Sequence, residues 1–297
     1  MKSNMENQDF DIILFYKYVK IEDTEQLRMD QVMLCTNLKL KGRCIIAEEG
    51  INFTLEGTPE NITEYIETMK KDERFADVDF KRSKGTGRAF PRLSIKIRDE
   101  IVTTLLGDED VDPRTETSKH LDPEEFHKII TSGEEYYIVD MRNDYEQDVG
   151  MFRGSVRSGM RNFRDLKKTA EELKHLKDKK VITVCTGGVR CEKASGYLLK
   201  KGYKDVSQLK GGIVRYLEAY KGENFDGRLY VFDGRITMEP FSDKHVVIGR
   251  CAKCDIHTEH FADCMSKTCG EHFLCCSRCR DEEGNATCLK CDKVAVA

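Results

Sequence analysis

The segment Cys185–Arg190, with the sequence Cys-Thr-Gly-Gly-Val-Arg, constrains the local fold more than any other part of this chain. The run Val181–Val184 precedes it and has the β-branched content of a buried strand. The segment Glu192–Lys201 follows, and its apolar residues recur with the spacing of one helix face. The order is therefore strand, cysteine, glycine loop, arginine and helix.

A thiol in such a loop faces backbone N–H groups and the positive end of a helix, and both favour the thiolate. These surroundings can lower a cysteine pKa from about 8.5 to roughly 3.5–7.5. Glycine allows the backbone to approach an anion closely, and Arg190 adds a positive charge. The residues between Cys185 and Arg190 are Thr186, Gly187, Gly188 and Val189. We interpret Cys185 as a reactive cysteine; the alternative is a buried cysteine at a strand end.

The length of 297 residues predicts two or three domains. The net charge is only −4 with 34% charged residues, so the surface has no strong overall sign. No segment resembles a signal peptide or an 18-residue apolar span, so we expect a cytoplasmic protein with no membrane contact. In that compartment, 13 cysteines indicate metal binding or thiol chemistry rather than disulfides.

The first segment, residues 1–106, alternates between strand and helix patterns. The expected strands are Ile12–Val19, Gly42–Ile46, Ile51–Leu55, Phe75–Lys81 and Leu93–Ile97, and the expected helices are Thr24–Leu38 and Pro59–Lys70. This order predicts a ferredoxin-like or acylphosphatase-like α+β sandwich. Residues 107–120 contain acidic residues and a proline, and we interpret them as a linker.

A basic stretch without acidic residues ends this first segment, from Lys81 to Arg98. Such a stretch in a weakly acidic protein is a candidate contact for an RNA backbone. The candidate RNA-binding residues are Lys81, Arg82, Lys84, Arg88 and Arg92. The alternative is a solvated strand edge on which lysine and arginine prevent aggregation.

The second segment, residues 121–220, predicts a parallel α/β domain. Its expected strands are Tyr136–Val139, Val181–Val184 and Val206–Leu209. Asp140 and Arg142 follow the first strand, and Cys185 follows the second. Ligands in such sheets bind at the carboxyl ends of strands, so we expect these three residues to face one crevice. A second basic run between residues 153 and 168 is either a solvated helix face or an RNA contact.

The third segment, residues 221–297, is rich in cysteine. Eight cysteines form four close pairs, which are Cys251 and Cys254, Cys264 and Cys269, Cys276 and Cys279, and Cys288 and Cys291. Two such pairs supply the four thiolates of a tetrahedral zinc ion, so the segment predicts up to two zinc ions. The spacing does not reveal which pairs combine. Unliganded thiols and an iron–sulfur cluster are the alternatives, although the spacings match neither common cluster pattern.

Taken together, these motifs resemble a known family. Asp140–Glu146 and Cys185–Ala194 are similar to the rhodanese domain, and Ile46–Asn52 is similar to the amino-terminal domain of the rhodanese-containing tRNA uridine hydroxylases. Gly211-Gly212-Ile213 and the cysteine-rich segment match the same family. The resemblance covers nearly the whole chain and implies a central rhodanese-like domain.

The resemblance also implies an activity, in which the wobble uridine at position 34 of tRNA becomes 5-hydroxyuridine with molecular oxygen as the oxygen source. Cys185 would be the reactive cysteine, Arg190 would close the anion cradle, and Asp140 with Arg142 would brace the pocket. No organic cofactor and no obligate protein partner are implied, and the anticodon loop of tRNA would be the partner. One hypothesis is that Cys185 adds to C6 of the base and that Cys191 resolves an oxidised Cys185.

Three other functions remain open from the sequence. A rhodanese loop alone favours sulfur transfer through a cysteine persulfide. The six-residue loop is one residue shorter than that of the phosphatases that resemble this fold, which disfavours phosphate chemistry. The third alternative is a zinc-ribbon RNA-binding module with an inert rhodanese domain, but inert members generally lose the loop cysteine.

Overall fold

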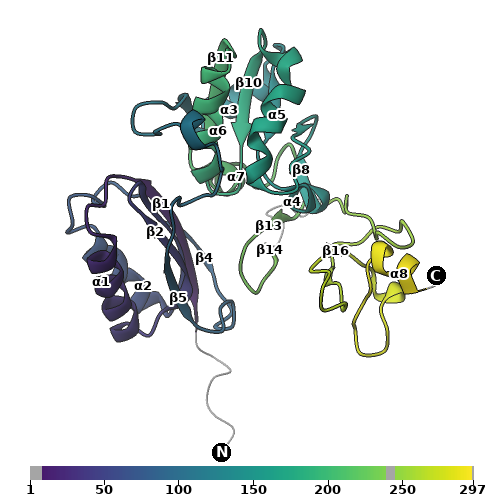
Figure 1. The fold of residues 1–297 in the computed structure, drawn as a ribbon, viewed down its shortest axis with the longest axis horizontal. Helices are drawn as coiled ribbons and strands as arrows, with labels where there is room; N and C mark the ends of the chain where they lie inside the picture. Colours follow the sequence, from purple (N-terminus) through teal and green to yellow (C-terminus); the bar gives the residue numbers. More distant parts are fainter. Residues whose placement is uncertain (1–8, 239–244, 296–297) are drawn as a thin grey trace, which may run out of the picture.

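The computed structural model describes residues 9–238 and 245–295. Figure 1 shows three parts: an amino-terminal sheet with two helices, a central α/β part, and a smaller carboxy-terminal part. A hairpin in the chain between the last two parts lies beside the amino-terminal sheet. Among the described helices, none has the length and apolar character needed to cross a membrane. The mixed α/β architecture confirms the predicted fold class.

The amino-terminal sheet has five strands. They are β1 (Asp11–Tyr18), β2 (Lys41–Ala47), β3 (Gly50–Gly57), β4 (Lys81–Lys84) and β5 (Leu93–Ile97). Their order is β4-β1-β3-β2-β5, and every pair is antiparallel except β2 with β5. The first four strands have the ferredoxin-like order, so the predicted sandwich is confirmed, with β5 added at one edge.

One predicted strand, Phe75–Lys81, is wrong. The chain there forms successive turns in which Phe75 N–H donates to Asp72 O and Val78 N–H donates to Phe75 O, and the strand begins only at Lys81. The Asp72 side chain also accepts from Arg74 N–H at 3.0 Å. Turn chemistry of this kind outweighs the alternating apolar pattern.

Helices α1 (Thr24–Asn37) and α2 (Pro59–Met69) cover one face of this sheet. Thr58 caps α2 by accepting from Asn61 N–H, and Pro59 occupies its first turn. Between helices and sheet lies a core that contains Phe15 and Phe53. The alternate residues of β1, including Leu14 and Tyr16, point to the opposite face, which has no helix of its own.

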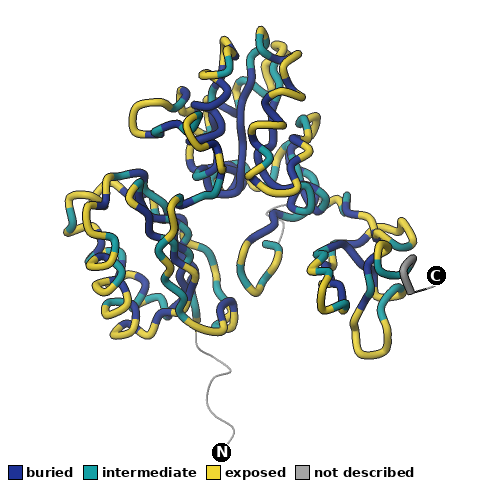
Figure 2. Tube along the Cα trace, viewed as in Figure 1, coloured by how far each residue is buried: buried dark blue, intermediate teal, exposed yellow. Residues whose placement is uncertain are grey.

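The central sheet is entirely parallel. Its strands are β6 (Lys119–Leu121), β7 (Tyr137–Asp140), β9 (Val156–Arg157), β10 (Lys180–Val184) and β11 (Asp205–Leu209), in the order β6-β11-β10-β7-β9. Helices α3 (Pro123–Thr131) and α7 (Gly212–Tyr220) pack on one face, and α5 (Leu166–Glu172) and α6 (Val189–Lys200) pack on the other. One apolar core therefore lies on each face of the sheet. Figure 2 shows that the strands between these cores are largely buried. The short helix α4 (Asp144–Val149) follows β7.

The remaining elements connect and complete the carboxy-terminal part. Strands β8 (Gly150–Phe152) and β12 (Phe225–Gly227) pair, β13 (Leu229–Tyr230) and β14 (Thr237–Met238) form the hairpin, and β15 (Phe261–Asp263) pairs with β16 (His272–Leu274). The last helix is α8 (Leu289–Ala295). The hydrophobic cluster between residues 251 and 291 consists largely of cysteines.

A buried lysine joins the amino-terminal part to the central part. Lys193 lies on α6 with no exposed surface, and its ammonium group contacts Glu49 at 2.8 Å, Glu100 at 3.2 Å and Asp110 at 2.8 Å. Glu49 belongs to the turn between β2 and β3, whereas Glu100 and Asp110 lie on the chain that leads to the central sheet. One positive charge therefore holds three separate segments against the helix that follows the cysteine loop.

We predict that Lys193→Met lowers the free energy of unfolding by about 3 kcal/mol, because it leaves three clustered carboxylates without their cation. Urea denaturation followed by tyrosine fluorescence measures the change. Lys204→Met is the control, since Lys204 pairs with Asp178 on the surface, where both side chains are more than 70% exposed. Equal denaturation midpoints for the two variants would contradict the structural role of Lys193.

Candidate active site

The cysteine loop connects β10 to α6, and backbone hydrogen bonds from the first turn of α7 fix its position. The carbonyl oxygens of Cys185 and Thr186 accept from Ile213 N–H at 2.9 Å and Val214 N–H at 3.1 Å. Gly212 lies directly under the loop, where a Cβ atom would come within 2.7 Å of loop backbone atoms. The Gly-Gly-Ile motif thus fixes the loop by close backbone contact, which only glycine permits.

The loop turns its N–H groups toward the sulfur of Cys185. Gly188 has a φ of 105°, a conformation that favours glycine, and its N–H donates to Cys185 Sγ at 3.2 Å. Burial raises the pKa of Cys185, but the Cys191 thiol, the Arg190 guanidinium and the backbone N–H groups of both residues more than offset it. The pKa of Cys185 is lowered to about 6, so the sulfur is a thiolate at neutral pH.

Cys191 has the opposite character. Burial and the neighbouring Cys185 sulfur raise its pKa well above the ordinary value. It lies in the first turn of α6 and is fully buried in the core. Cys191 is therefore a protonated thiol that donates a hydrogen bond to the Cys185 thiolate.

Arg190 is fixed by a carboxylate that the sequence analysis did not single out. Its guanidinium donates to both oxygens of Glu146, at 2.6 Å and 2.8 Å, and Glu146 is fully buried. Thr186 Oγ1 contacts both groups at 3.3 Å. The Phe232 ring lies 5.7 Å from the guanidinium. The only sequence signal for Glu146 was its place in the Asp140–Glu146 motif.

Asp140 and Arg142 lie behind this site. Arg142 donates to both Asp140 oxygens, and both side chains are fully buried. Arg142 also donates to Gly150 O at 2.6 Å and to Glu146 O at 3.4 Å. Neither residue lines the cavity above Cys185, so their geometry suits support of the Glu146 segment rather than contact with a ligand.

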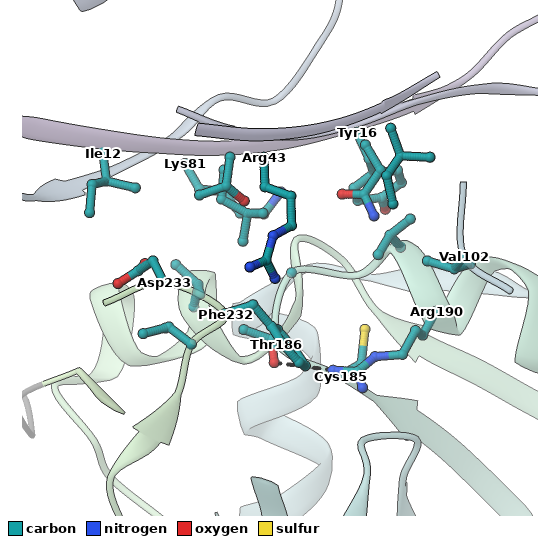
Figure 3. A pocket seen from close by; sticks show the side chains of 18 of the residues that line it. Ile12, Tyr16, Arg43, Lys81, Val102, Cys185, Thr186, Arg190, Phe232 and Asp233 are labelled. Atoms are coloured by element: carbon teal, nitrogen blue, oxygen red, sulfur yellow. Dashed lines mark hydrogen bonds between the residues drawn. The ribbon is translucent and has the colours of Figure 1, made fainter. Parts of the chain in front are cut away.

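Above the loop lies a cavity of about 350 Å³, which we call the chamber. Most of its walls come from the uncovered face of the amino-terminal sheet, the cysteine loop and the β13–β14 hairpin, and residues 101–103 of the connecting chain also line it. Figure 3 shows Arg43 reaching from the sheet toward Phe232, with Cys185 and Arg190 on the opposite side. Most of the chamber wall is apolar, and polar groups such as Asn52 and Thr54 are interspersed on the sheet side. A volume of this size accommodates a nucleoside-sized ligand.

The predicted RNA-binding residues divide into two groups. Lys81 and Arg82 line the chamber, although Lys81 is buried against Asp79 at 3.0 Å and Arg82 contacts Asp11 at 2.6 Å. The other three residues lie outside the chamber and are exposed: Lys84, Arg88 and Arg92. Sequence reasoning missed two further cationic residues of the chamber wall, Arg43 and Arg235.

The second basic run is largely engaged in ion pairs within the chain. The pairs are Arg153 with Asp226, Arg157 with Asp148, Arg161 with Glu271, Lys167 with Glu109 and Lys168 with Glu172. This arrangement favours the interpretation of a solvated, ion-paired surface over that of an RNA contact.

The eight paired cysteines converge into two groups of four. The first group is Cys251, Cys254, Cys276 and Cys279, and the second is Cys264, Cys269, Cys288 and Cys291. The sulfurs in each group lie within 4.8 Å of one another, and the Cys254–Cys276 and Cys269–Cys288 sulfurs are each 3.6 Å apart. Tetrahedral zinc with bonds of about 2.3 Å separates its sulfurs by roughly 3.8 Å. Each group could therefore hold one metal ion, whereas an iron–sulfur cluster would need wider spacing.

Comparison with known proteins agrees with this geometry. The family described as "Rhodanese-like domain" matches residues 122–219, "UPF0176 acylphosphatase like domain" matches residues 10–101, and "Rhodanase C-terminal" matches residues 226–292. A solved rhodanese-like domain protein from Staphylococcus aureus is 24% identical, covers 33% of this chain and 90% of that chain, and has a TM-score of 0.29. The three family matches together define the class as a three-part protein built around a rhodanese-like domain.

Full-length relatives define the family more closely. The tRNA uridine(34) hydroxylase of Bacillus licheniformis is 43% identical over 274 residues, which cover 91% of this chain and 84% of that protein. The protein of the same name from Staphylococcus carnosus is 41% identical over 292 residues, which cover 93% of this chain and 92% of that protein. This chain belongs to the tRNA uridine(34) hydroxylase family, which confirms the predicted family.

We predict that Cys185 ionises with a midpoint near pH 6. The thiolate absorbs at 240 nm, so the absorbance difference between the wild type and Cys185→Ala should rise through that pH. Cys44→Ala is the control, because burial raises the pKa of Cys44 well above its ordinary value. The absorbance difference between the wild type and Cys44→Ala should therefore not change with pH below pH 8. A Cys185 midpoint at the ordinary value of about 8.5 would contradict the account of the loop.

Proposed function

We propose that this protein converts uridine 34 of tRNA into 5-hydroxyuridine, with molecular oxygen as the oxygen source and Cys185 as the reactive residue. The main support is similarity over more than nine-tenths of the chain to proteins named tRNA uridine(34) hydroxylase. The low pKa of a cysteine beneath a nucleoside-sized chamber supports the same activity. Its substrate, tRNA, implies action in the cytoplasm.

The chamber suits a single base turned out of the anticodon loop. Single-stranded recognition uses aromatic stacking and contacts to base edges, and Phe232 offers a ring that is 44% exposed. Arg43 supplies positive charge at the chamber wall for the flanking phosphates, whereas Arg235 is paired with the buried Asp233 carboxylate at 2.7 Å. The exposed residues Arg88 and Arg92 would extend this contact along the RNA.

In the chemical step that we propose, the Cys185 thiolate attacks C6 of the uracil. A sulfur–C6 bond forms, the C5–C6 double bond opens, and its electron pair makes C5 nucleophilic toward oxygen. One oxygen atom of O2 becomes the C5 hydroxyl, and the other leaves as water with two electrons and two protons from two thiol molecules, which become a disulfide. Loss of the C5 proton and cleavage of the sulfur–C6 bond restore the double bond and free Cys185.

Sulfur transfer is the second candidate, because the Gly188 N–H bond to Cys185 Sγ would also stabilise a persulfide. Cys185 has no exposed surface, however, and the amino-terminal sheet covers the loop. A persulfide acceptor would have to enter the same chamber as the base, so the preference for hydroxylation rests on the full-length relatives.

We predict that cells lacking this protein and any redundant pathway contain no 5-hydroxyuridine-derived nucleosides in tRNA, as measured by nucleoside mass spectrometry. The wild-type gene should restore them, and Cys185→Ala should not, because it removes the nucleophile. Cys35→Ala is the control, since Cys35 is buried in the amino-terminal core away from the chamber. Persistence of the nucleosides without the protein rules out the hydroxylase activity, and loss of a thiolated nucleoside instead supports sulfur transfer.

We also propose that each group of four cysteines holds one zinc ion that stabilises the carboxy-terminal part. Its support is the clustering of four sulfurs around one centre, together with the N–H bonds from Cys276 to Cys251 Sγ and from Cys288 to Cys264 Sγ, both at 3.4 Å. The small core of this part contains few apolar side chains besides cysteine, so metal ligation would supply much of its folding energy. No step of the hydroxylation is assigned to these ions.

We predict that the purified protein contains two zinc ions per chain, as measured by inductively coupled plasma mass spectrometry. Cys254→Ser should retain one, because a group with three thiolates binds zinc far more weakly. Cys275→Ser is the matched control and should retain two, since Cys275 lies outside both groups. A metal-free wild type, or a content that does not respond to Cys254→Ser, would contradict the assignment.

A further inference from the structure

We propose that Tyr16 is the proton donor to the base in the chamber and that Glu192 and His120 form a hydrogen-bonded chain that supplies this proton from the protein surface. This inference rests on the proposed hydroxylation and adds residues to it. None of the three residues was singled out by the sequence analysis. They come from β1, α6 and β6, so only the fold brings them together.

The chain of hydrogen bonds is continuous from the chamber to the surface. The Tyr16 hydroxyl donates to Glu192 Oε1 at 2.9 Å, and the same oxygen lies 2.9 Å from His120 Nε2. Tyr16 lines the chamber. The Glu192 side chain is 12% exposed and that of His120 is 37% exposed. Protons can therefore pass between solvent and chamber through two contacts.

The Tyr16 hydroxyl also lies against the loop that holds the reactive sulfur. A Cβ atom on Gly188 would lie 2.8 Å from the Tyr16 oxygen, and the N–H of the same glycine donates to Cys185 Sγ at 3.2 Å. Tyrosine and thiolate thus flank one residue of the loop. A base held with C6 above the sulfur would have its other ring atoms within reach of the hydroxyl.

The middle of the chain is fixed in place. The second oxygen of Glu192 accepts from Thr117 Oγ1 at 3.0 Å and from Gln208 Nε2 at 3.2 Å. These bonds hold the carboxylate with its first oxygen between Tyr16 and His120. The shared first oxygen makes the hydrogen-bonded path from Tyr16 to His120 continuous.

The resting protonation states suit proton delivery. Burial and then the Glu192 carboxylate raise the pKa of Tyr16 well above its ordinary value, so it is a neutral phenol. The hydrogen bond to Glu192 raises the pKa of His120, which favours imidazolium. Burial raises the pKa of Glu192, but the bonds from His120, Tyr16 and Thr117 outweigh it and keep the carboxylate ionised.

The proposed step balances without any oxidant. When Cys185 adds to C6, negative charge moves to O4 of the uracil. The Tyr16 hydroxyl turns from Glu192 toward O4, its O–H bond breaks as its proton forms an O–H bond with O4, and the Tyr16 oxygen takes a proton through Glu192 from His120. The O4 proton leaves when C5 attacks oxygen and the C4 carbonyl re-forms. The imidazolium becomes neutral imidazole and is reprotonated by solvent.

The pH dependence follows from the groups around the chain. His120 faces Glu192, Lys210 and Asp122, and among these the carboxylates raise its pKa while Lys210 lowers it. Tyr16 faces Glu192, Cys185 and Tyr18, and the Lys81 ammonium lies 5.4 Å from its ring. Because imidazolium is the proton source, the rate should fall as pH rises through the raised pKa of His120.

The test is the single-turnover rate of 5-hydroxyuridine formation on tRNA as a function of pH, with enzyme in excess. Tyr16→Phe should slow the reaction by about 100-fold with little change in tRNA affinity, in the range expected for loss of a general acid. His120→Gln should slow it less and abolish the alkaline decline. Tyr18→Phe is the matched control and should react at the wild-type rate, since its hydroxyl donates to the Val189 carbonyl at 3.2 Å.

A wild-type rate for Tyr16→Phe, or an equal loss in Tyr18→Phe, overturns the assignment of Tyr16. An unchanged alkaline decline in His120→Gln overturns the proton chain. A wild-type protein that binds tRNA but forms no 5-hydroxyuridine overturns the proposed function, and the inference falls with it. The rate of 5-hydroxyuridine formation by the wild type therefore tests the proposed function, and the rates of the variants test the proton chain.

Discussion

The buried ammonium group of Lys193 is the interaction on which the arrangement of the active site depends. It contacts three carboxylates that come from the β2–β3 turn and from the chain entering the central sheet. Lys193 lies three residues after Arg190 on the same helix, so this contact sets the distance between the amino-terminal sheet and the cysteine loop. The Arg215–Asp79 ion pair and the Tyr16–Glu192 hydrogen bond join the same two parts, but Lys193 is the fully buried member of these contacts.

The site combines two opposing effects on one sulfur. Burial disfavours a thiolate, whereas Arg190 and the loop N–H groups favour it, and the second effect prevails. Arg190 itself is shared with the buried Glu146 carboxylate, which fixes its direction and leaves only part of its charge for the sulfur. The Cys185 side chain has no exposed surface, and this burial strengthens the charge interactions of its sulfur.

Local patterns predicted much of this molecule. The order of strands and helices indicated the ferredoxin-like sandwich, and the run from Val181 to Lys201 indicated the strand, loop and helix around Cys185. Cysteine spacing indicated the four pairs, but only the fold shows that the first pair combines with the third and the second with the fourth. These features depend on residues that are close in the sequence, so local sequence patterns are sufficient to predict them.

Features that depend on contacts between distant segments could not be predicted from the sequence. The chamber needs the uncovered face of the amino-terminal sheet to lie on the cysteine loop, and no periodicity in β1 reveals its partner. Tyr16 and Glu192 are 176 positions apart, and Glu146 and Arg190 are 44 apart. No local pattern distinguishes Arg43 on β2 from other exposed strand residues, and only the structure shows that it lines the chamber. The turns at Phe75–Lys81 were missed because side-chain bonds by Asp72 compete with strand formation.

The central claim is that uridine 34 enters the chamber with its C6 atom against Cys185. The structure of the anaerobic complex with a tRNA anticodon stem-loop tests it most directly. The account predicts nucleotide 34 turned out of the loop into the chamber, beside Phe232, with C6 about 3.5 Å or less from Cys185 Sγ, the separation of a reactive arrangement. A complex in which base 34 lies outside the chamber, or in which Cys185 faces another part of the nucleotide, would contradict it.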